Sequence, residues 1–184
     1  MPRLGLNTFL YASPFTTAHA PALFAKLKKW GFETVEIPVE ALEHIDPAKV
    51  KAAADKAGLA IGSVCACMGP GRDFRGTAAE QKTAMDYCKK LIDQAVIMGC
   101  PSIIGPLYSV VGRIGAHTDA EKKQHFKDVV KNLKVLAAYA QKRGVTLCVE
   151  PLNRFETDFL NTCDQGLKLV KAARLSARHI WRAV

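Results

Sequence analysis

The segment around Glu150 holds the residues of this sequence best suited to chemistry. Residues 145–149 form an apolar, strand-like run, and Glu150 follows it directly, ahead of a polar loop that contains Arg154 and Glu156. A carboxylate at the end of a buried strand is costly to leave unpaired, so it is expected to meet a cation. That cation is either a side chain such as Arg154 or a divalent metal. Position alone leaves a structural ion pair and a metal-binding or acid/base role both open.

Other polar and aromatic residues stand where strand-like segments end. Glu36 either reaches a pocket or supports its neighbours through hydrogen bonds. Six further residues could wall a pocket, with ordinary packing as the alternative for each: Asn7, Phe9, Tyr11, Cys67, Leu107 and Tyr108. Residues 68–76, MGPGRDFRG, favour a mobile active-site loop over a phosphate site, because no helix begins directly on the glycines.

A recurring sequence motif predicts the helices and strands that position these residues. A helical pattern ends in Gly and, after one or two residues, a short β-branched run begins, as in KKWGFETVEIP, DKAGLAIGSVC, IMGCPSIIGP and QKRGVTLCVEP. Glycine after a helix can take the left-handed conformation that turns the chain into the next strand. The glycines of these four predicted helix–strand junctions are Gly31, Gly58, Gly99 and Gly144.

Helix starts are marked as well. Asp46-Pro47 supplies a capping residue followed by Pro, and three pairs have capping-box spacing: Thr77 with Glu80, Thr118 with Glu121, and Thr162 with Gln165. We expect strands over residues 4–9, 33–37, 59–65, 102–106 and 145–150. Helices are expected over residues 17–30, 47–57, 77–98, 119–142 and 162–172.

Strict alternation of apolar strands with helices predicts a parallel sheet covered by helices. The α/β folds of this kind are the doubly wound sheet and the (β/α)8 TIM barrel. The segment after the first strand, TFLYASPFT, lacks the Gly-rich turn of a dinucleotide fold, so the barrel is preferred. In barrels, catalytic groups project from the carboxyl ends of the strands, where Glu36, Cys67 and Glu150 are expected.

A resemblance to a known family becomes specific in residues 149–166, VEPLNRFETDFLNTCDQG. This stretch resembles the fifth-strand signature of the D-tagatose/D-psicose (allulose) 3-epimerases, within the xylose-isomerase-like barrel superfamily. The segments GFETVEIP, MGPGRDFRG and the opening residues 5–9 also fit that group. The similarity covers about residues 4–172.

The resemblance implies a chemistry for two residues. Glu150 would be a metal ligand and one of two Glu acid/base residues, and Glu156 would hydrogen-bond the sugar. In the family a divalent ion, usually Mn²⁺, Co²⁺ or Mg²⁺, supports C3 epimerisation of a ketose through a cis-enediolate, whose charge must be stabilised. Asn7, Cys67 and Leu107 would contribute to the sugar pocket. Whether the substrate is a free ketose or a sugar phosphate stays open.

The sequence departs from the family after residue 172. The family pattern continues with a sixth strand bearing an Asp ligand, then a His ligand and a second Glu, whereas this chain ends KAARLSARHIWRAV. Since such barrels run from about 200 to 250 residues or more, we expect about five β/α units in residues 1–172, followed by a basic, poorly packed tail in residues 173–184. We therefore expect the 184-residue chain to be incomplete, to bind divalent metal weakly and to show little or no epimerisation. The alternative is a non-catalytic fragment or binding module of the same fold.

Composition excludes several other classes. With 49% hydrophobic and 23% charged residues, the chain is expected to be globular and cytoplasmic, without a membrane partner. The net charge of +9 comes from lysines and arginines that lie mostly on predicted helices without interleaved aromatics, so a solvated face is favoured over nucleic-acid binding. Six scattered cysteines are read as buried free thiols. The early predicted strands do not end in the histidines that the superfamily's multi-zinc nucleases need, which argues against a zinc nuclease. Whether the chain forms a homo-oligomer stays open.

Overall fold

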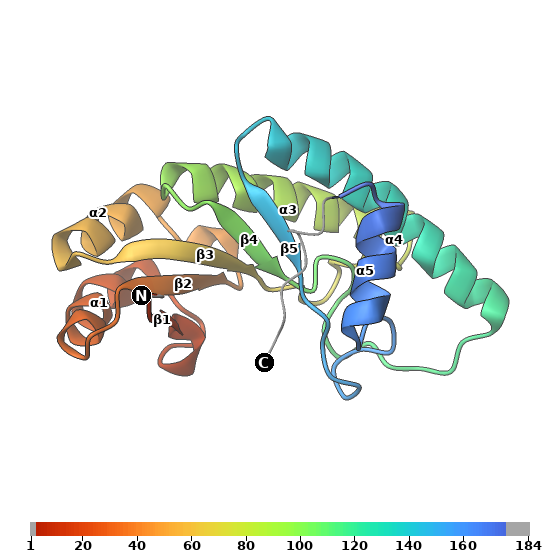
Figure 1. The fold of residues 1–184 in the computed structure, drawn as a ribbon, viewed down its shortest axis with the longest axis horizontal. Helices are drawn as coiled ribbons and strands as arrows, with labels where there is room; N and C mark the ends of the chain where they lie inside the picture. The colour runs from red at the N-terminus through yellow and green to blue at the C-terminus, as the bar shows by residue number, and fades with distance from the viewer. Residues whose placement is uncertain (1–2, 176–184) are drawn as a thin grey trace.

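The computed structural model describes residues 3–175 and contains one five-stranded parallel sheet, with strands in the order β1-β2-β3-β4-β5 (Figure 1). The strands are β1 (Gly5–Asn7), β2 (Thr34–Val39), β3 (Ala60–Ala66), β4 (Ser102–Gly105) and β5 (Thr146–Val149). The helices are α1 (Ala20–Lys29), α2 (Pro47–Ala57), α3 (Ala78–Ile97), α4 (Asp119–Gln141) and α5 (Cys163–Ala172). Each strand is followed by a helix, which confirms the expected five β/α units.

All four neighbouring strand pairs are parallel. Leu6 pairs with Val35, Val64 with Ile103, and Ile103 with Leu147. The register between β2 and β3 shifts between Val35 and Glu36, which is a local irregularity of the bulge type. The parallel order brings every strand's carboxyl end, and therefore every loop singled out in the sequence, to one edge of the sheet.

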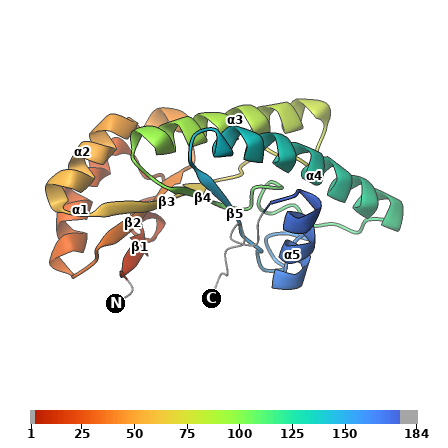
Figure 2. The same cartoon turned by 45° about the horizontal axis from the view of Figure 1, so that its top comes forward.

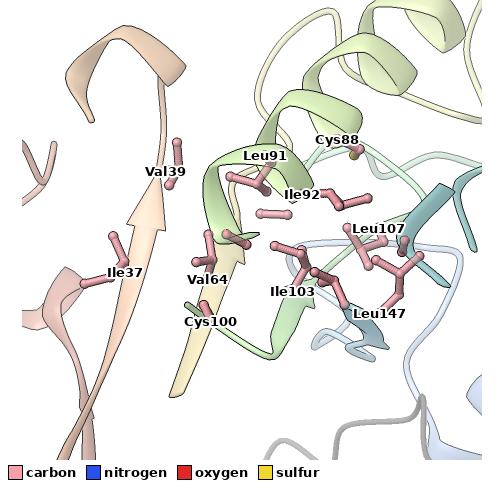
Figure 3. Close-up of a cluster of buried hydrophobic side chains, with 14 of the residues drawn as sticks. Ile37, Val39, Val64, Cys88, Leu91, Ile92, Cys100, Ile103, Leu107 and Leu147 are labelled. Carbon is pink, nitrogen blue, oxygen red and sulfur yellow. The ribbon is translucent and has the colours of Figure 1, made fainter. Parts of the chain in front are cut away.

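Packing between the sheet and its helices forms the core. Figure 2 shows α2, α3 and α4 lying along one face of the sheet. Strand residues on that face are fully buried, and Figure 3 shows Ile37, Val64, Ile103 and Leu147 gathered with Leu91 and Ile92 of α3. The residues between them point to the opposite face and are half-buried, because side chains alternate along a strand: Glu36, Ser63, Cys65 and Cys148.

Local signals set the helix boundaries. The side chains of Thr77, Thr118 and Thr162 each accept a hydrogen bond from the backbone three residues later, in complete capping boxes. Asp46 caps α2 through Lys49 N. The four junction glycines have positive φ: Gly31 (92°), Gly58 (69°), Gly99 (65°) and Gly144 (70°). These contacts confirm the predicted helix starts and helix–strand junctions.

The largest boundary differences lie at the N-terminal end. The strand expected over residues 4–9 is only Gly5–Asn7, because the Asn7 side chain accepts a hydrogen bond from Phe9 N and starts a 3-10 turn, Thr8–Leu10. The helix expected from residue 17 begins with a 3-10 turn, Thr17–His19, before α1. Short-range hydrogen bonds of this kind override the hydrophobic pattern.

Two expectations about the tail and the cysteines need correction. Ala173 is buried and Leu175 packs against the core, so the first residues of the predicted tail are packed. Residues 176–184, with Ile180 and Trp181, lie outside the described part. All six cysteines are free, as expected, but only Cys88 and Cys100 are buried, and Cys163 is exposed.

Within residues 3–175, no helix is long and apolar enough to span a membrane. Cytoplasmic location, the absence of nucleic-acid partners and self-association stay predictions.

Candidate active site

Glu150 follows β5 and enters a pocket at the carboxyl edge of the sheet. Its backbone is held on both sides, since Glu150 N donates to Gly105 O (3.0 Å) and the Tyr108 hydroxyl donates to Glu150 O (3.0 Å). The pocket has a volume of about 610 Å³. It is lined by Phe9, Glu40, Cys65, Ala66, Cys67, Met68, Gly69, Pro70, Pro106, Val111, Glu150, Leu152 and Glu156.

Within residues 3–175, the carboxylate of Glu150 forms no ion pair. Arg154, the predicted ion-pair partner, instead places its guanidinium 5.0 Å from the ring centre of Phe155. Within the described residues, the Glu150 side chain has no ion pair or hydrogen bond. Burial raises the pKa of Glu150, and the carboxylates of Glu36 and Glu156 raise it further. A carboxyl group with a raised pKa holds a proton closer to neutral pH, which suits a general acid or base.

Glu36 is bound by its neighbours. Asn7 Nδ2 donates to Glu36 Oε1 (2.7 Å), and the Ser63 hydroxyl donates to Glu36 Oε2, so the carboxylate joins β1, β2 and β3. Burial raises the pKa of Glu36, while the hydrogen bond from Ser63 acts in the opposite direction. Of the two roles left open by the sequence, the structure shows the hydrogen-bonding one, since Glu36 is not among the residues that line the pocket and acts on Glu150 only through its charge. Asn7 contacts Glu36 and is not among the residues that line the pocket.

Glu156 reaches the same pocket from the loop after β5. Its carboxylate accepts a hydrogen bond from Asn153 Nδ2, and its backbone carbonyl accepts one from Gly112 N (2.7 Å). The second contact ties the loop after β5 to the loop after β4. Glu150 and Glu156, the two residues carried over from the family resemblance, therefore face one cavity.

Cys67 lines the pocket, and α3 holds its backbone. Cys67 N donates to the Tyr87 hydroxyl (2.9 Å), which in turn donates to Val39 O (2.6 Å). Hydrogen bonding to Cys67 and burial raise the pKa of the Cys65 thiol well above its usual range, with smaller effects of Glu36 and Glu150. Both thiols are therefore placed to shape the pocket, and Cys65 stays protonated at neutral pH.

The remaining predicted wall residues divide into two groups. Phe9 lines the pocket. Leu107 and Tyr108 are fully buried in the core, and Tyr11 packs against Trp30 with ring centres 5.7 Å apart. The structure does not bring Leu107 to the pocket lining, so its role in sugar binding stays a prediction, as does that of Asn7.

Sequence reasoning missed Glu40, which lines the pocket one residue beyond β2. Its Oε1 accepts a hydrogen bond from Ser13 Oγ (3.0 Å). The rule that searches the carboxyl ends of strands would have found it, had the search after the second strand extended to residue 40.

Sequence reasoning also missed an ionic network that joins the three loops around the pocket. Arg75, whose side chain is 1% exposed, pairs with Asp158 (2.6 Å), and Asp158 also accepts from Gly115 N (2.8 Å) and lies 3.0 Å from His117 Nε2. Beside it, Arg113 pairs with Asp73 (2.7 Å). We call Arg75, Asp158, His117, Arg113 and Asp73 the loop network.

The loop network changes the interpretation of residues 68–76. Arg72 Nη1 donates to Glu40 O (2.8 Å) and Cys67 O (2.9 Å), while Arg75 is committed to Asp158. Both arginines of the MGPGRDFRG loop thus bind protein groups and do not present a phosphate site. The loop is fastened to its neighbours by these contacts.

The described residues do not form a metal centre. No group of three or more His, Cys, Asp or Glu side chains within residues 3–175 is arranged to hold an ion. Glu36 is bound by Asn7 and Ser63, and Glu156 by Asn153, which leaves Glu150 as the carboxylate without a bound partner. One carboxylate is too few for a divalent cation, which takes several oxygen ligands.

Comparison with known proteins identifies the family. The xylose isomerase-like TIM barrel family matches residues 24–179, most of the chain. This chain belongs to that family. The five-stranded parallel sheet is accordingly part of a TIM-barrel-like fold.

Similar curated proteins carry the names of 3-epimerases. A protein of Synechocystis sp. named "Probable ketose 3-epimerase" is 26% identical over 178 residues, which is 92% of this chain and 58% of that protein. The D-psicose 3-epimerase of Ruminiclostridium cellulolyticum is 28% identical over 152 residues, 79% of this chain and 50% of that one. The chain thus spans between half and three-fifths of the length of these relatives.

Solved structures agree on the fold. A D-allulose 3-epimerase from Methylomonas sp. superposes with a TM-score of 0.86 at 21% identity, covering 97% of this chain and 61% of that one. An L-ribulose 3-epimerase gives 0.85 at 22% identity, covering 98% of this chain and 59% of the other. These neighbours share the arrangement of the described β/α units, which corresponds to a partial barrel.

Proposed function

We propose that this chain carries one half of a ketose 3-epimerase site, with Glu150 as the acid/base group that faces C3 of the sugar. The observation that supports this most is the Glu150 carboxylate itself. It stands at the end of β5, in a cavity of about 610 Å³, with a raised pKa and without a bound partner among the described residues. A structural carboxylate would be expected to hold a cation or a hydrogen-bond donor.

The chemistry needs such a group. A proton next to a ketone is removed only when the resulting enediolate is stabilised, and a carboxylate shielded from water is a stronger base than one in bulk solvent. Glu150 would take or return the C3 proton. Glu156, facing the same cavity, would hydrogen-bond the sugar, and Cys67 would form part of the wall. Asn7 would act indirectly, by holding Glu36.

The pocket lining favours a free ketose over a sugar phosphate. Three carboxylates, those of Glu40, Glu150 and Glu156, line the pocket, and no Lys, Arg or His of the described chain does. A phosphate group would meet like charges at short range, which raises the free energy of binding. Neutral hydroxyl groups can instead donate hydrogen bonds to these carboxylates.

A divalent metal ion, Mn²⁺ with Co²⁺ or Mg²⁺ as alternatives, belongs to the reaction that the family resemblance implies. The described residues of the pocket do not fit such an ion, because Glu150 is the one carboxylate of the described lining without a hydrogen-bond partner. We therefore propose weak Mn²⁺ binding at Glu150 and assign no step of the reaction to the ion.

A second candidate function is sugar binding without turnover. Inversion at C3 requires one group to remove the proton and another to deliver it from the opposite face. Only Glu150 combines a raised pKa with a free carboxylate among the pocket residues. With this group alone, little or no inversion at C3 is expected, and a chain that also fails to exchange the C3 proton with solvent would be a sugar-binding module.

One experiment separates these functions. The chain is incubated with D-fructose or D-tagatose in D₂O with Mn²⁺, and saturation-transfer NMR, C3 deuteration and chromatography of the epimers are followed together. We expect sugar binding and slow C3 deuteration that is lost in Glu150→Gln and kept in the exposed control Glu33→Gln. Binding without deuteration would favour the second candidate, and no binding of either ketose would exclude both.

A further inference from the structure

A second cavity lies between the first half of α4 and α5, and it shares no lining residue with the carboxylate pocket. It has a volume of about 610 Å³, and its walls come from both helices and from the loop that precedes α5. Figures 1 and 2 both show α5 beside the N-terminal half of α4. We call this cavity the α4–α5 groove. It is lined by Lys122, Lys123, Phe126, Lys127, Asp158, Phe159, Leu160, Gln165, Lys168 and Leu169.

The groove has an apolar floor. Leu160 and Leu169 are buried, and Phe126 and Phe159 are half-buried. The ring faces are already in use, since Lys168 Nζ lies 5.7 Å from the centre of Phe126, and Tyr108 and Arg75 lie 5.5 and 5.1 Å from that of Phe159. The floor therefore offers apolar ring edges and aliphatic surface for contact.

The rim of the groove is basic, because four of its lining residues are lysines and one is an acid. Lys122, Lys123, Lys127 and Lys168 form no ion pairs with other groups in residues 3–175. Asp158 is the one carboxylate in the lining, and its charge is already matched by Arg75 and His117.

We propose that the α4–α5 groove binds a small organic anion that has an apolar body, with its carboxylate, sulfate or phosphate at the lysine rim. Charge complementarity selects the anion, and the floor selects the apolar body. The cavity volume lies in the range of about 300–1,000 Å³ that is usual for small-molecule sites. This proposal does not depend on the proposed epimerase function, because the two cavities have opposite charge and share no lining residue.

A matched pair of probes tests the proposal. 1-Anilinonaphthalene-8-sulfonate carries the required charge, and N-phenyl-1-naphthylamine has the same ring system without it. Fluorescence titrations of the 184-residue chain are expected to show tighter binding of the sulfonate, weakened by salt because exposed charges are screened.

A matched pair of variants locates the site. Replacing Lys123, Lys127 and Lys168 with Gln removes three charges from the groove, and replacing Lys29, Lys56 and Lys131 with Gln removes three from exposed positions elsewhere. At about 0.2–1 kcal/mol per exposed pair, the groove variant should lose about 3- to 150-fold in sulfonate affinity. The control variant and the neutral probe should change less than about twofold.

Three outcomes would overturn the proposal. Equal loss in both variants would show that net charge alone attracts the probe. An unchanged affinity in the groove variant would place the probe elsewhere, and absence of sulfonate binding would leave the lysines as an ordinary solvated face. Far-UV circular dichroism of each variant ensures that only folded chains are compared.

Discussion

Two groups of charged residues at the same edge of the sheet differ in whether their carboxylates are paired with cations. In the loop network, the carboxylate of Asp158 is matched by Arg75, His117 and the Gly115 amide. A short distance along the same loop, Glu150 faces a cavity whose lining, within residues 3–175, contains two other carboxylates and no Lys, Arg or His. The first arrangement stabilises the folded chain, and the second stores an unfavourable interaction that a substrate or ion can relieve. The contrast separates residues that hold the site from residues that act in it.

The largest expected effect comes from breaking the loop network. Asp158→Ala leaves the guanidinium of Arg75, 1% exposed, without its partner. Loss of one member of a buried pair destabilises a protein by about 3–5 kcal/mol. Urea unfolding at pH 7 measures the change. The control is Asp55→Ala, which breaks the exposed Lys51–Asp55 pair and should cost about 0–1 kcal/mol. Similar losses in both variants would contradict the special role of the network.

Acid should remove part of the same stabilisation. Burial alone would raise the pKa of Asp158, but the hydrogen bond and charge of Arg75 outweigh it, and the pKa is lowered. A lowered folded-state pKa means that the stabilisation is present above the unfolded pKa of about 3.9 and is lost as the pH falls through the folded-state value. Asp158→Asn should therefore be less stable than wild type by about 1.5–3 kcal/mol at pH 7. The gap should close as the pH falls below the folded-state pKa of Asp158, and a gap independent of pH would argue against the charge.

Glu150 should show the opposite pH dependence. Its pKa is raised in the folded chain, so the folded state holds the proton more tightly and stability falls as the pH rises from the unfolded value toward the folded one. Glu150→Gln lacks this loss and should be about 0.5–2 kcal/mol more stable than wild type at pH 7, as is common where function opposes stability. No gain is expected at pH 4. Thermal unfolding at both pH values measures it, and a variant that is less stable at pH 7 would show an unrecognised partner of Glu150.

The smallest expected effect is that of metal. With Glu150 as the one free carboxylate, a dissociation constant above about 1 mM is expected, so 1 mM Mn²⁺ should stabilise the chain by less than about 0.4 kcal/mol. Thermal unfolding with Mn²⁺ or with a chelator measures the difference. A large stabilisation that disappears in Glu150→Gln would reveal a complete metal site.

Local features of the sequence predicted most of the fold. Gly58, Gly99 and Gly144 mark helix ends, and Thr77 and Thr118 mark helix starts, because these signals act within a few residues. The position of Glu150 followed from the rule that barrel strands deliver functional groups at their carboxyl ends. That rule needs only the strand and its direction.

Long-range partners could not be predicted in this way. Arg75 and Asp158 lie in different loops, and their residue types were each compatible with several roles. Glu36 could be read as a pocket residue or as a hydrogen-bonded support until the contacts of Asn7 and Ser63 were known. Leu107 was expected at the pocket and lies in the core, because the chain turns directly after β4, where Leu107 N donates to Gly105 O (2.8 Å), and this local turn sets the side-chain direction.

Tyr87 links the pocket to the body of the fold. Its hydroxyl accepts a hydrogen bond from Cys67 N and donates one to Val39 O. The carboxyl ends of β2 and β3 are therefore tied to α3. Cys67 lies beyond the ladder of β3, where an amide would ordinarily exchange its hydrogen rapidly with solvent. Because it is hydrogen-bonded to the hydroxyl of the buried Tyr87, this amide should exchange only when α3 itself opens. The pocket wall at Cys67 and the buried face of α3 are thus expected to open together. The cavity should keep its shape for as long as α3 stays folded.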